Sequence, residues 1–356
     1  MKLLSKYHLG DLELSNRVVM APMTRSRAIG NIPNEMMATY YGQRASNGLI
    51  ISEGTSPSPN GIGYSRIPGI YSQEQVEGWK KVTSVVHKVG AKFFVQLMHT
   101  GRVSHPLNMP KGSKVLAPSS IKISGQMWTD QEGLQDYPIP TEMTKDEIKS
   151  TIDEYVDASI NAIKAGADGV EIHGANGYLI EQFICPDSNM RTDEYGGSVK
   201  NRTRFALEVT QKVADAIGKE KVGIRISPYG VFNDITIYDS LDETYDYLTK
   251  ELNNIGIRYI HMVDHQSMGS PEVPQKIKDL VRKNFKNTLI LSGGYDKDRA
   301  EKDLNDDKAD LVAFGRPILA NPDFVNKISN DLELNQVNYD LLYTPDEKGY
   351  TDYPSA

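Results

Sequence analysis

Three side chains that can hold an oxygen atom and deliver a proton follow one apolar run of the sequence. His173, Asn176 and Tyr178 stand in the segment HGANGYL, directly after the strand-like residues 169–172. Imidazole and amide groups donate hydrogen bonds to a carbonyl oxygen, and a phenol with an ordinary pKa of about 10 is protonated at neutral pH. The spacing therefore indicates a site that polarises a carbonyl group and protonates an atom beside it. A histidine on an apolar strand is more often a satisfied core residue, so residues elsewhere in the chain must distinguish a functional histidine from a core one.

Polar side chains that packing alone does not require also occur within two other apolar runs. Arg225 lies inside residues 222–227, and Gln96 lies inside residues 92–97. A buried guanidinium without an acceptor is costly, so Arg225 needs an electron-rich partner. The amide of Gln96 offers a donor and an acceptor, which suits the edge of a heterocycle, although a satisfied inward glutamine explains this residue when it is taken alone.

Two further runs end in turns that suit a phosphate group. Gly293 and Gly294 follow one run, and Gly315 and Arg316 follow the other. Backbone N–H groups without a Cβ nearby bind phosphate at the mouths of barrels, and the arginine adds charge. A phosphate-bearing ligand is the leading interpretation, and turn glycines without a ligand are the alternative.

The elements that position these residues form a repeat of strands and helices. Near-continuous apolar runs alternating with amphipathic segments predict a parallel sheet covered by helices, and eight repeats predict an α/β fold of the (β/α)8 TIM-barrel type. An open doubly wound sheet is the second choice, but no glycine-rich dinucleotide fingerprint follows the first run. The predicted strands are residues 17–20, 49–53, 92–97, 169–172, 222–227, 258–262, 288–292 and 311–315. The clearest helices are predicted at 72–89, 144–165, 200–217 and 238–255, the second of them opened by a capping box of Thr144 and Glu147.

We expect one domain over residues 1–356, with two segments near the active-site mouth. Residues 100–143 are rich in Pro, Gly and Ser with short β-like pieces at 115–117 and 121–123, and long insertions of this kind usually cap a site. The aromatic tail at 340–356 is expected to fold back toward the same mouth, and a disordered tail is the alternative.

The composition restricts the partners and the compartment. The chain has 356 residues, 24% of them charged, with a formal net charge of -7, which argues against a nucleic-acid-binding face. No apolar run of membrane-spanning or signal-peptide length occurs, so we expect a cytoplasmic protein. The sequence leaves the oligomeric state open between a monomer and a homodimer. The single cysteine, Cys185, provides neither a disulfide nor a four-cysteine metal site, so we expect no metal and a borrowed organic cofactor for any redox chemistry.

Together these pieces resemble the old yellow enzyme family of FMN-dependent ene-reductases. They occur in barrel order over nearly the whole chain, and the set is specific although no single piece is. The matching segments are APMTR at 21–25, VQL at 95–97, HTGR at 99–102, HGANGYL at 173–179, RTDEYGGS at 191–198, RISP at 225–228, SGG at 292–294 and FGRP at 314–317.

The resemblance implies tightly but non-covalently bound FMN, with NADPH or NADH as the reductant in a ping-pong reaction. Thr24 would bond the flavin O4 edge, Gln96 its pyrimidine edge, and Arg225 the N1–O2 edge, where charge accumulates on reduction. The implied cofactor-binding residues are Pro22, Met23, Thr24, Gly54, Gln96, Arg225, Gly293, Gly294, Gly315 and Arg316.

The resemblance also implies the roles of the substrate-binding residues. His173 and Asn176 would hold the oxygen of a carbonyl or nitro group, which makes the β-carbon of the conjugated alkene electrophilic, and Tyr178 would protonate the α-carbon. Met98 stands where the family often has tryptophan, which leaves the facial selectivity open. The predicted pocket walls are Tyr64, Met98, Phe232 and Tyr350, with ordinary core or surface positions as the alternative for the three aromatics.

Two other functions are compatible with these residues. A non-redox phosphate-binding barrel, a lyase or isomerase, would use Arg225 and His173 and needs a lysine or carboxylate at a strand end, for which Glu53 is the one obvious candidate. A flavin- or steroid-binding protein without catalysis is the other. An enone, a quinone, a nitroester or a nitroaromatic each provides the acceptor oxygen that His173 and Asn176 require.

Overall fold

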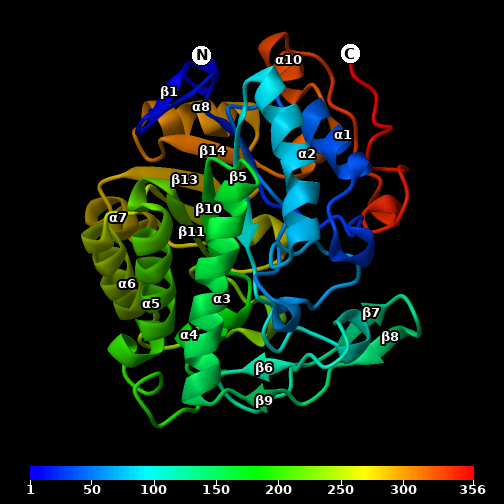
Figure 1. Ribbon diagram of the computed structural model, residues 1–356. Coiled ribbons are helices and arrows are strands. Elements are labelled where there is room, and N and C mark those ends of the chain that lie inside the picture. The colour runs from blue at the N-terminus through cyan, green and yellow to red at the C-terminus, as the bar shows by residue number, and fades with distance from the viewer.

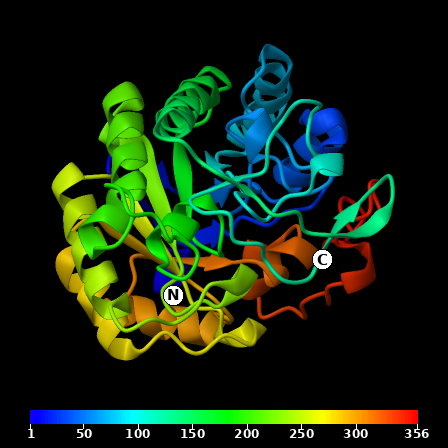
Figure 2. The ribbon, with the colours of Figure 1, turned by 90° about the horizontal axis from the view of Figure 1, so that it is seen from below.

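Eight parallel strands close into a barrel, with helices as an outer ring (Figures 1 and 2). The computed structural model describes residues 1–356. The predicted (β/α)8 barrel is confirmed, because each of the eight predicted runs is one of its strands, with bounds that agree to within two residues. The barrel strands are β3 (Val18–Met20), β4 (Leu49–Ile51), β5 (Lys92–Leu97), β10 (Gly169–Gly174), β11 (Val222–Ile226), β12 (Tyr259–Val263), β13 (Thr288–Ser292) and β14 (Leu311–Phe314).

The four predicted helices are present and are four of ten. Thr144 and Glu147 form the predicted capping box at the start of α3, because each side chain accepts a hydrogen bond from the other residue's backbone N–H. No helix combines the length and the apolar character that crossing a membrane requires. The helices are α1 (Glu35–Gln43), α2 (Gln73–Val89), α3 (Lys145–Lys164), α4 (Leu179–Ile184), α5 (Val199–Ile217), α6 (Leu241–Ile255), α7 (Gln275–Asn284), α8 (Lys297–Asn305), α9 (Arg316–Ala320) and α10 (Phe324–Ser329).

The barrel interior is apolar at one end and polar at the other. Leu9 and Leu14 come from an antiparallel hairpin, β1 (Tyr7–Leu9) and β2 (Leu12–Leu14), and pack with inward side chains of the barrel strands. Toward the carboxyl ends of the strands the inward positions become polar: Glu171 is paired with Gln96, and Arg225 lies between His173 and His261 in the strand register. The N-terminal hairpin was not predicted, and it closes the amino end of the barrel.

The segment after β5 lies at the opposite end from this hairpin (Figure 1). It contains two small sheets: β6 (Leu116–Ala117) pairs with β9 (Thr141–Glu142), and β7 (Gln126–Thr129) pairs with β8 (Gly133–Asp136). The predicted β-like piece at 115–117 overlaps β6, whereas residues 121–123 are not a strand. Residues of β7 and β8 reach the cavity described next.

Candidate functional site

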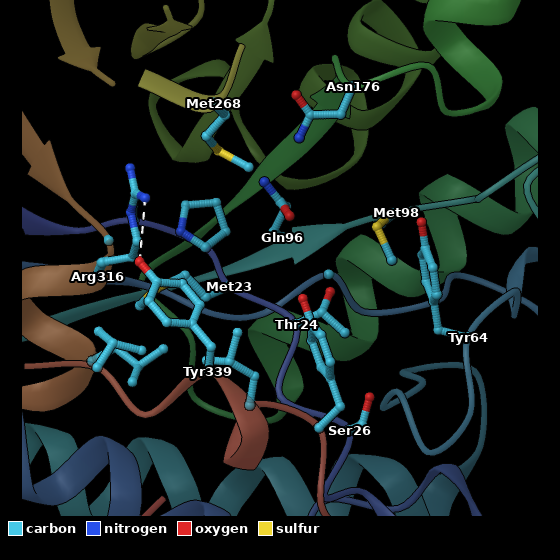
Figure 3. Close-up of a pocket in the computed structure, with 18 of the residues that line it drawn as sticks. Met23, Thr24, Ser26, Tyr64, Gln96, Met98, Asn176, Met268, Arg316 and Tyr339 are labelled. Atoms are coloured by element: carbon cyan, nitrogen blue, oxygen red, sulfur yellow. Dashed lines mark hydrogen bonds between the residues drawn. The ribbon is translucent and has the colours of Figure 1, made fainter. Parts of the chain in front are cut away.

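A cavity of about 1730 Å³ opens at the carboxyl ends of the barrel strands (Figure 3). Every barrel strand, or the segment directly after it, contributes to its lining. Pockets for one small ligand usually measure about 300–1,000 Å³, so this cavity has room for a large ligand and a second molecule beside it. The predicted site residues that line it are Pro22, Met23, Thr24, Gly54, Tyr64, Gln96, Met98, His173, Asn176, Tyr178, Arg225, Gly293, Gly294, Gly315 and Arg316.

His173 is a neutral hydrogen-bond donor at the end of β10. Burial, together with the nearby charge of Arg225, lowers its pKa well below the ordinary value of 6.5. Its Nδ1 accepts a hydrogen bond from the backbone N–H of Ala175 at 3.3 Å. The single ring proton is therefore on Nε2, which can donate to an oxygen in the cavity.

Asn176 occupies a strained turn that fixes its backbone. Its φ of 60° lies in the left-handed region, which asparagine tolerates better than most residues. Ser227 Oγ accepts a hydrogen bond from its N–H at 2.9 Å, and Asn233 Nδ2 donates to its carbonyl oxygen at 2.7 Å. The side-chain Oδ1 lies 2.6 Å from His265 Nε2. The turn thus presents the Asn176 amide to the cavity beside His173.

Tyr178 and Tyr64 form a pair of phenols next to His173. Their hydroxyl oxygens are 3.0 Å apart, and the Tyr178 ring lies edge-on to the His173 ring with 4.9 Å between centroids. Burial raises the pKa of Tyr178 to about 12. The phenol therefore keeps its proton throughout the physiological pH range and can act as a general acid.

The floor of the cavity holds an unpaired cation beside an oriented amide. Arg225 is 7% exposed, its guanidinium donates no hydrogen bond within the chain, and its Nε is buried without a partner. Gln96 Nε2 donates to Glu171 Oε1 at 2.8 Å, and Glu171 Oε2 lies 2.9 Å from His261 Nδ1. This bond directs the Nε2 of Gln96 toward Glu171, so its Oε1 is the atom left to accept a hydrogen bond from a ligand.

The opposite side of the cavity has the features of a phosphate site. The backbone N–H groups of Gly294 and Gly315 donate no hydrogen bond within the chain, and Gly294 has a φ of 64°. Arg316 lies beside them, 3.5 Å from the hydroxyl of Tyr339 and 3.3 Å from Ser267 Oγ (Figure 3). Free backbone donors next to a guanidinium bind a dianionic phosphate.

These observations fit the FMN that the resemblance implies. Arg225 needs an acceptor that the protein does not provide, and the N1–O2 edge of a flavin is one. The hydroxyl of Thr24 makes no hydrogen bond within the chain, so it is free for the O4 edge. The absence of a side chain at Gly54 has a cause within the protein, because a Cβ there would lie 2.4 Å from Met98 Sδ.

Two predicted pocket walls do not line the cavity. Tyr350 is fully buried and stacks on Tyr40 with 4.0 Å between centroids, under the guanidinium groups of Arg25 and Arg27. Cation–π contacts of this kind hold the ring away from the cavity and attach the tail to the loop after β3. The C-terminal part of the chain lines the cavity through residues 334–337, 339–340 and 342–345 instead. Phe232 is also absent from the cavity lining, and its ring lies 4.5 Å from that of His265.

Several residues that line the cavity are not among those predicted from the sequence. Asp264, His265 and Met268 follow β12, and Trp128 and Leu134 come from the β7–β8 hairpin. The strand-end rule that identified His173 applies equally after residues 258–262 and would have found His265. The hairpin residues carry no comparable signal, because an exposed tryptophan in a loop does not show which site it faces.

Glu53 does not face the cavity. It is buried, accepts hydrogen bonds from Arg25 N at 3.2 Å and Tyr41 Oη at 3.3 Å, and is absent from the lining. Burial raises its pKa to about 7. The carboxylate that a lyase or isomerase would require is therefore not presented to a ligand, which disfavours that alternative.

Comparisons with known proteins agree with this geometry. The sequence profile of the NADH:flavin oxidoreductase / NADH oxidase family matches residues 2–335. The chain is 45% identical to 12-oxophytodienoate reductase 1 of Oryza sativa subsp. japonica, over 99% of this chain and 92% of that protein. It is 40% identical to 12-oxophytodienoate reductase 7 of the same plant, over 99% and 94%.

The barrel also superimposes on solved structures. Morphinone reductase aligns with a TM-score of 0.96 and 41% identity, covering 99% of this chain and 96% of that one. A structure of morphinone reductase in complex with tetrahydroNAD aligns with a TM-score of 0.95 and 41% identity, covering 100% and 98%.

Proposed function

The chain belongs to the old yellow enzyme family, and we propose that His173, Asn176 and Tyr178 carry out its reaction. The protein is an FMN-dependent NAD(P)H ene-reductase that acts on the activated C=C bond of α,β-unsaturated carbonyl or nitro compounds. When bound, FMN would supply the hydride-transfer chemistry that links oxidation of NAD(P)H to reduction of the alkene. The assignment of roles to individual side chains is our proposal.

The observation that carries the proposal is the fixed protonation of His173 and Tyr178 at one cavity. His173 is neutral with its proton on Nε2, and Tyr178 keeps its proton because burial raises its pKa to about 12. These groups face the same space as Arg225, which has no acceptor of its own. His173 and Asn176, which we call the oxygen clamp, thus share one cavity with the proton donor Tyr178 and with Arg225. Neither His173 nor Tyr178 has to gain or lose a proton when a ligand binds.

In this reaction His173 Nε2–H and the Asn176 amide hold the substrate oxygen, where negative charge develops as the β-carbon is reduced. Tyr178 then gives its proton to the α-carbon. Arg225 would balance charge at the N1–O2 edge of the cofactor, Gln96 and Thr24 would hold its other edges, and Gly294, Gly315 and Arg316 would hold its phosphate.

The substrate range follows from what the clamp requires. His173 and Asn176 need only an acceptor oxygen, so quinones and nitroesters are included in the proposed range, with NADPH or NADH as the reductant. The relatives include reductases of 12-oxophytodienoate and of morphinone, which accords with ketone substrates. Met98, buried at the wall beside Tyr64, sets the width of the pocket on that side.

We further propose that the protein works in the cytoplasm, as a monomer or a homodimer, without nucleic acid or a membrane. One cysteine in 356 residues and a need for NAD(P)H both suit a reducing compartment. The net charge of -7 gives no electrostatic reason for binding nucleic acid.

Tyr178→Phe tests the proton donor. We expect this variant to slow reoxidation by 2-cyclohexenone by about 100-fold or more, while its reduction by NADPH stays within a few-fold of wild type. Anaerobic stopped-flow absorbance of the flavin measures both half-reactions separately.

Tyr64→Phe is the matched control, because it removes the neighbouring hydroxyl and keeps the proton of Tyr178. Its enone rate should fall much less. Equal enone rates for Tyr178→Phe and wild type would refute the assigned donor, and a larger loss in Tyr64→Phe would move the role to that residue.

A further inference from the structure

His265 makes one short contact that orients a member of the oxygen clamp. Its Nε2 lies 2.6 Å from Oδ1 of Asn176, and the two residues come from different loops, after β12 and after β10. The carbonyl oxygen of an amide only accepts hydrogen bonds, so the imidazole Nε2 carries a proton and donates it. Asn176 Nδ2 has no hydrogen-bond partner in the chain and points toward the Gln96 side of the cavity (Figure 3).

The orientation of this amide decides whether Asn176 attracts or repels a substrate oxygen. With Oδ1 turned to His265, Nδ2 faces the cavity and donates. An amide turned by 180° would present its oxygen instead, and two acceptor oxygens repel each other. No other hydrogen bond within the chain fixes the side chain, because the other bonds of Asn176 are made by its backbone to Ser227 and Asn233.

The surroundings of His265 keep its ring in place and neutral. The residue is buried, and its ring packs edge-on against Phe232 at 4.5 Å and 65°. Burial, with a smaller contribution from Arg225, lowers its pKa to about 3. A neutral ring with one proton can serve Asn176 without adding a charge to the cavity.

We propose that His265 is a positioning residue for the reaction, which holds the Asn176 amide with its N–H side toward the oxygen of the activating carbonyl or nitro group. The inference rests on the proposed role of Asn176 as an oxygen clamp. It also gives Phe232 a place in the site, as the support behind His265 and not as a pocket wall.

A double-mutant cycle tests whether His265 acts through Asn176. The variants are His265→Leu, which removes the donor, His265→Gln, which retains an N–H donor, Asn176→Ala, and the double variant His265→Leu/Asn176→Ala. Two quantities are measured on flavin-loaded protein: the dissociation constant of 4-chlorophenol, from the change in flavin absorbance, and the rate of reoxidation by 2-cyclohexenone. Flavin content and thermal unfolding verify that each variant is folded, and His8→Leu, an exposed histidine on β1, is the matched control.

We expect His265→Leu to weaken phenol binding and slow enone reduction by about fivefold to tenfold, the value of one hydrogen bond. His265→Gln should recover most of the loss. In the Asn176→Ala background, loss of His265 should change either quantity by less than twofold, because coupled residues are not additive.

Three outcomes would overturn the inference. An equal effect of His265→Leu in both backgrounds would mean that His265 contacts the ligand itself or acts on the fold. An effect of Asn176→Ala without any effect of His265→Leu would refute only the positioning role. If Asn176→Ala leaves both quantities unchanged, the proposed clamp function of Asn176 fails, and the role of His265 fails with it.

Discussion

Burial sets the protonation state of the titratable side chains His173, Tyr178 and His265. It lowers the pKa of His173 and His265 and raises that of Tyr178, so the histidines are neutral and the phenol is protonated at the same pH. A site with these groups keeps three hydrogen-bond donors over a wide pH range. None of them needs a charged partner, which leaves Arg225 free for the cofactor.

Glu181 is the carboxylate that holds the loop between His173 and Tyr178. It accepts hydrogen bonds from Gly177 N at 2.7 Å and from Ser227 Oγ at 2.9 Å, and Ser227 in turn bonds the backbone of Asn176. No cation pairs with it, and burial raises its pKa to about 7 from 4.5. Its titration is therefore coupled to stability.

We expect the contribution of Glu181 to the free energy of unfolding to fall as the pH rises from about 4.5 to about 7. In this window the folded state keeps the proton of Glu181 and the unfolded state has lost it, so this contribution is highest below the window and lowest above it. Glu181→Gln does not titrate, and its free energy of unfolding relative to that of the wild type should therefore increase by roughly 1–3 kcal/mol across the same window.

Denaturant unfolding between pH 4.5 and 8 measures this difference. Glu74→Gln, at an exposed position of α2, is the control and should follow the wild type. Parallel curves for Glu181→Gln and wild type would show that Glu181 titrates at its ordinary pKa in the folded state.

At the scale of elements, one arginine connects three segments around the cavity mouth. Arg66 donates to the carbonyl oxygens of Ser26 at 2.9 Å and Tyr343 at 2.8 Å, and it is ion-paired with Asp130 in the turn between β7 and β8. The loop after β3, the C-terminal tail and the β7–β8 hairpin are joined in this way. All three contribute lining residues to the cavity.

Arg66→Met should loosen this connection while filling a similar volume. We expect the KM for 2-cyclohexenone to rise about threefold to tenfold with little change in kcat or flavin content, because charge-assisted bonds to the rim are lost and the reacting groups are untouched. Steady-state kinetics measure this. Arg258→Met, at the far end of the barrel, is the control and should leave the KM unchanged. If the KM of Arg66→Met equals that of the wild type, other contacts hold the rim of the cavity.

The sequence predicts the barrel strands well because each one is a short apolar run with a helix after it, a local pattern. The strand pattern also predicts that the site residues lie together, since the carboxyl ends of parallel strands share one edge. Fifteen of the predicted site residues line one cavity. The direction of Tyr350 depends on Tyr40 and two distant arginines, and that of Phe232 on His265. Contacts between remote segments leave no periodic signal, so the sequence does not show that these two rings lie outside the cavity lining. The hairpin β1–β2 was missed for a different reason, because each of its strands has only three residues.

At the scale of the whole molecule, the barrel is built around a charge that it does not neutralise. Arg225 lies on an interior strand position with an unpaired Nε, and removing such a charge often stabilises a protein that lacks its partner. The unpaired charge thus lowers the stability of the folded protein without FMN, and binding of FMN restores this stability. Stability and cofactor content are linked for this reason.

Removal of FMN should lower the melting temperature of the wild type by several degrees. A ligand at 100 times its dissociation constant stabilises by about 2.7 kcal/mol, and added FMN should restore the loss in a concentration-dependent way. Arg225→Met should be at least as stable as the wild type without FMN and gain less when FMN is added.

Differential scanning calorimetry of both proteins, with and without FMN, measures these shifts. Arg17→Met, at the amino end of β3, is the control for loss of an arginine. If FMN raises the melting temperature of the wild type and of Arg225→Met equally, the unpaired charge of Arg225 does not contribute to the stabilisation by FMN.

The hairpin β1–β2 has a consequence for the order of events in turnover. Leu9 and Leu14 seal the barrel from below, so a molecule that reaches the reacting face must depart by the route through which it arrived. Electron donor and electron acceptor therefore share one opening, at the carboxyl ends of the strands. Successive use of this opening requires a group that holds two electrons between the two events, which is chemistry that bound FMN would supply.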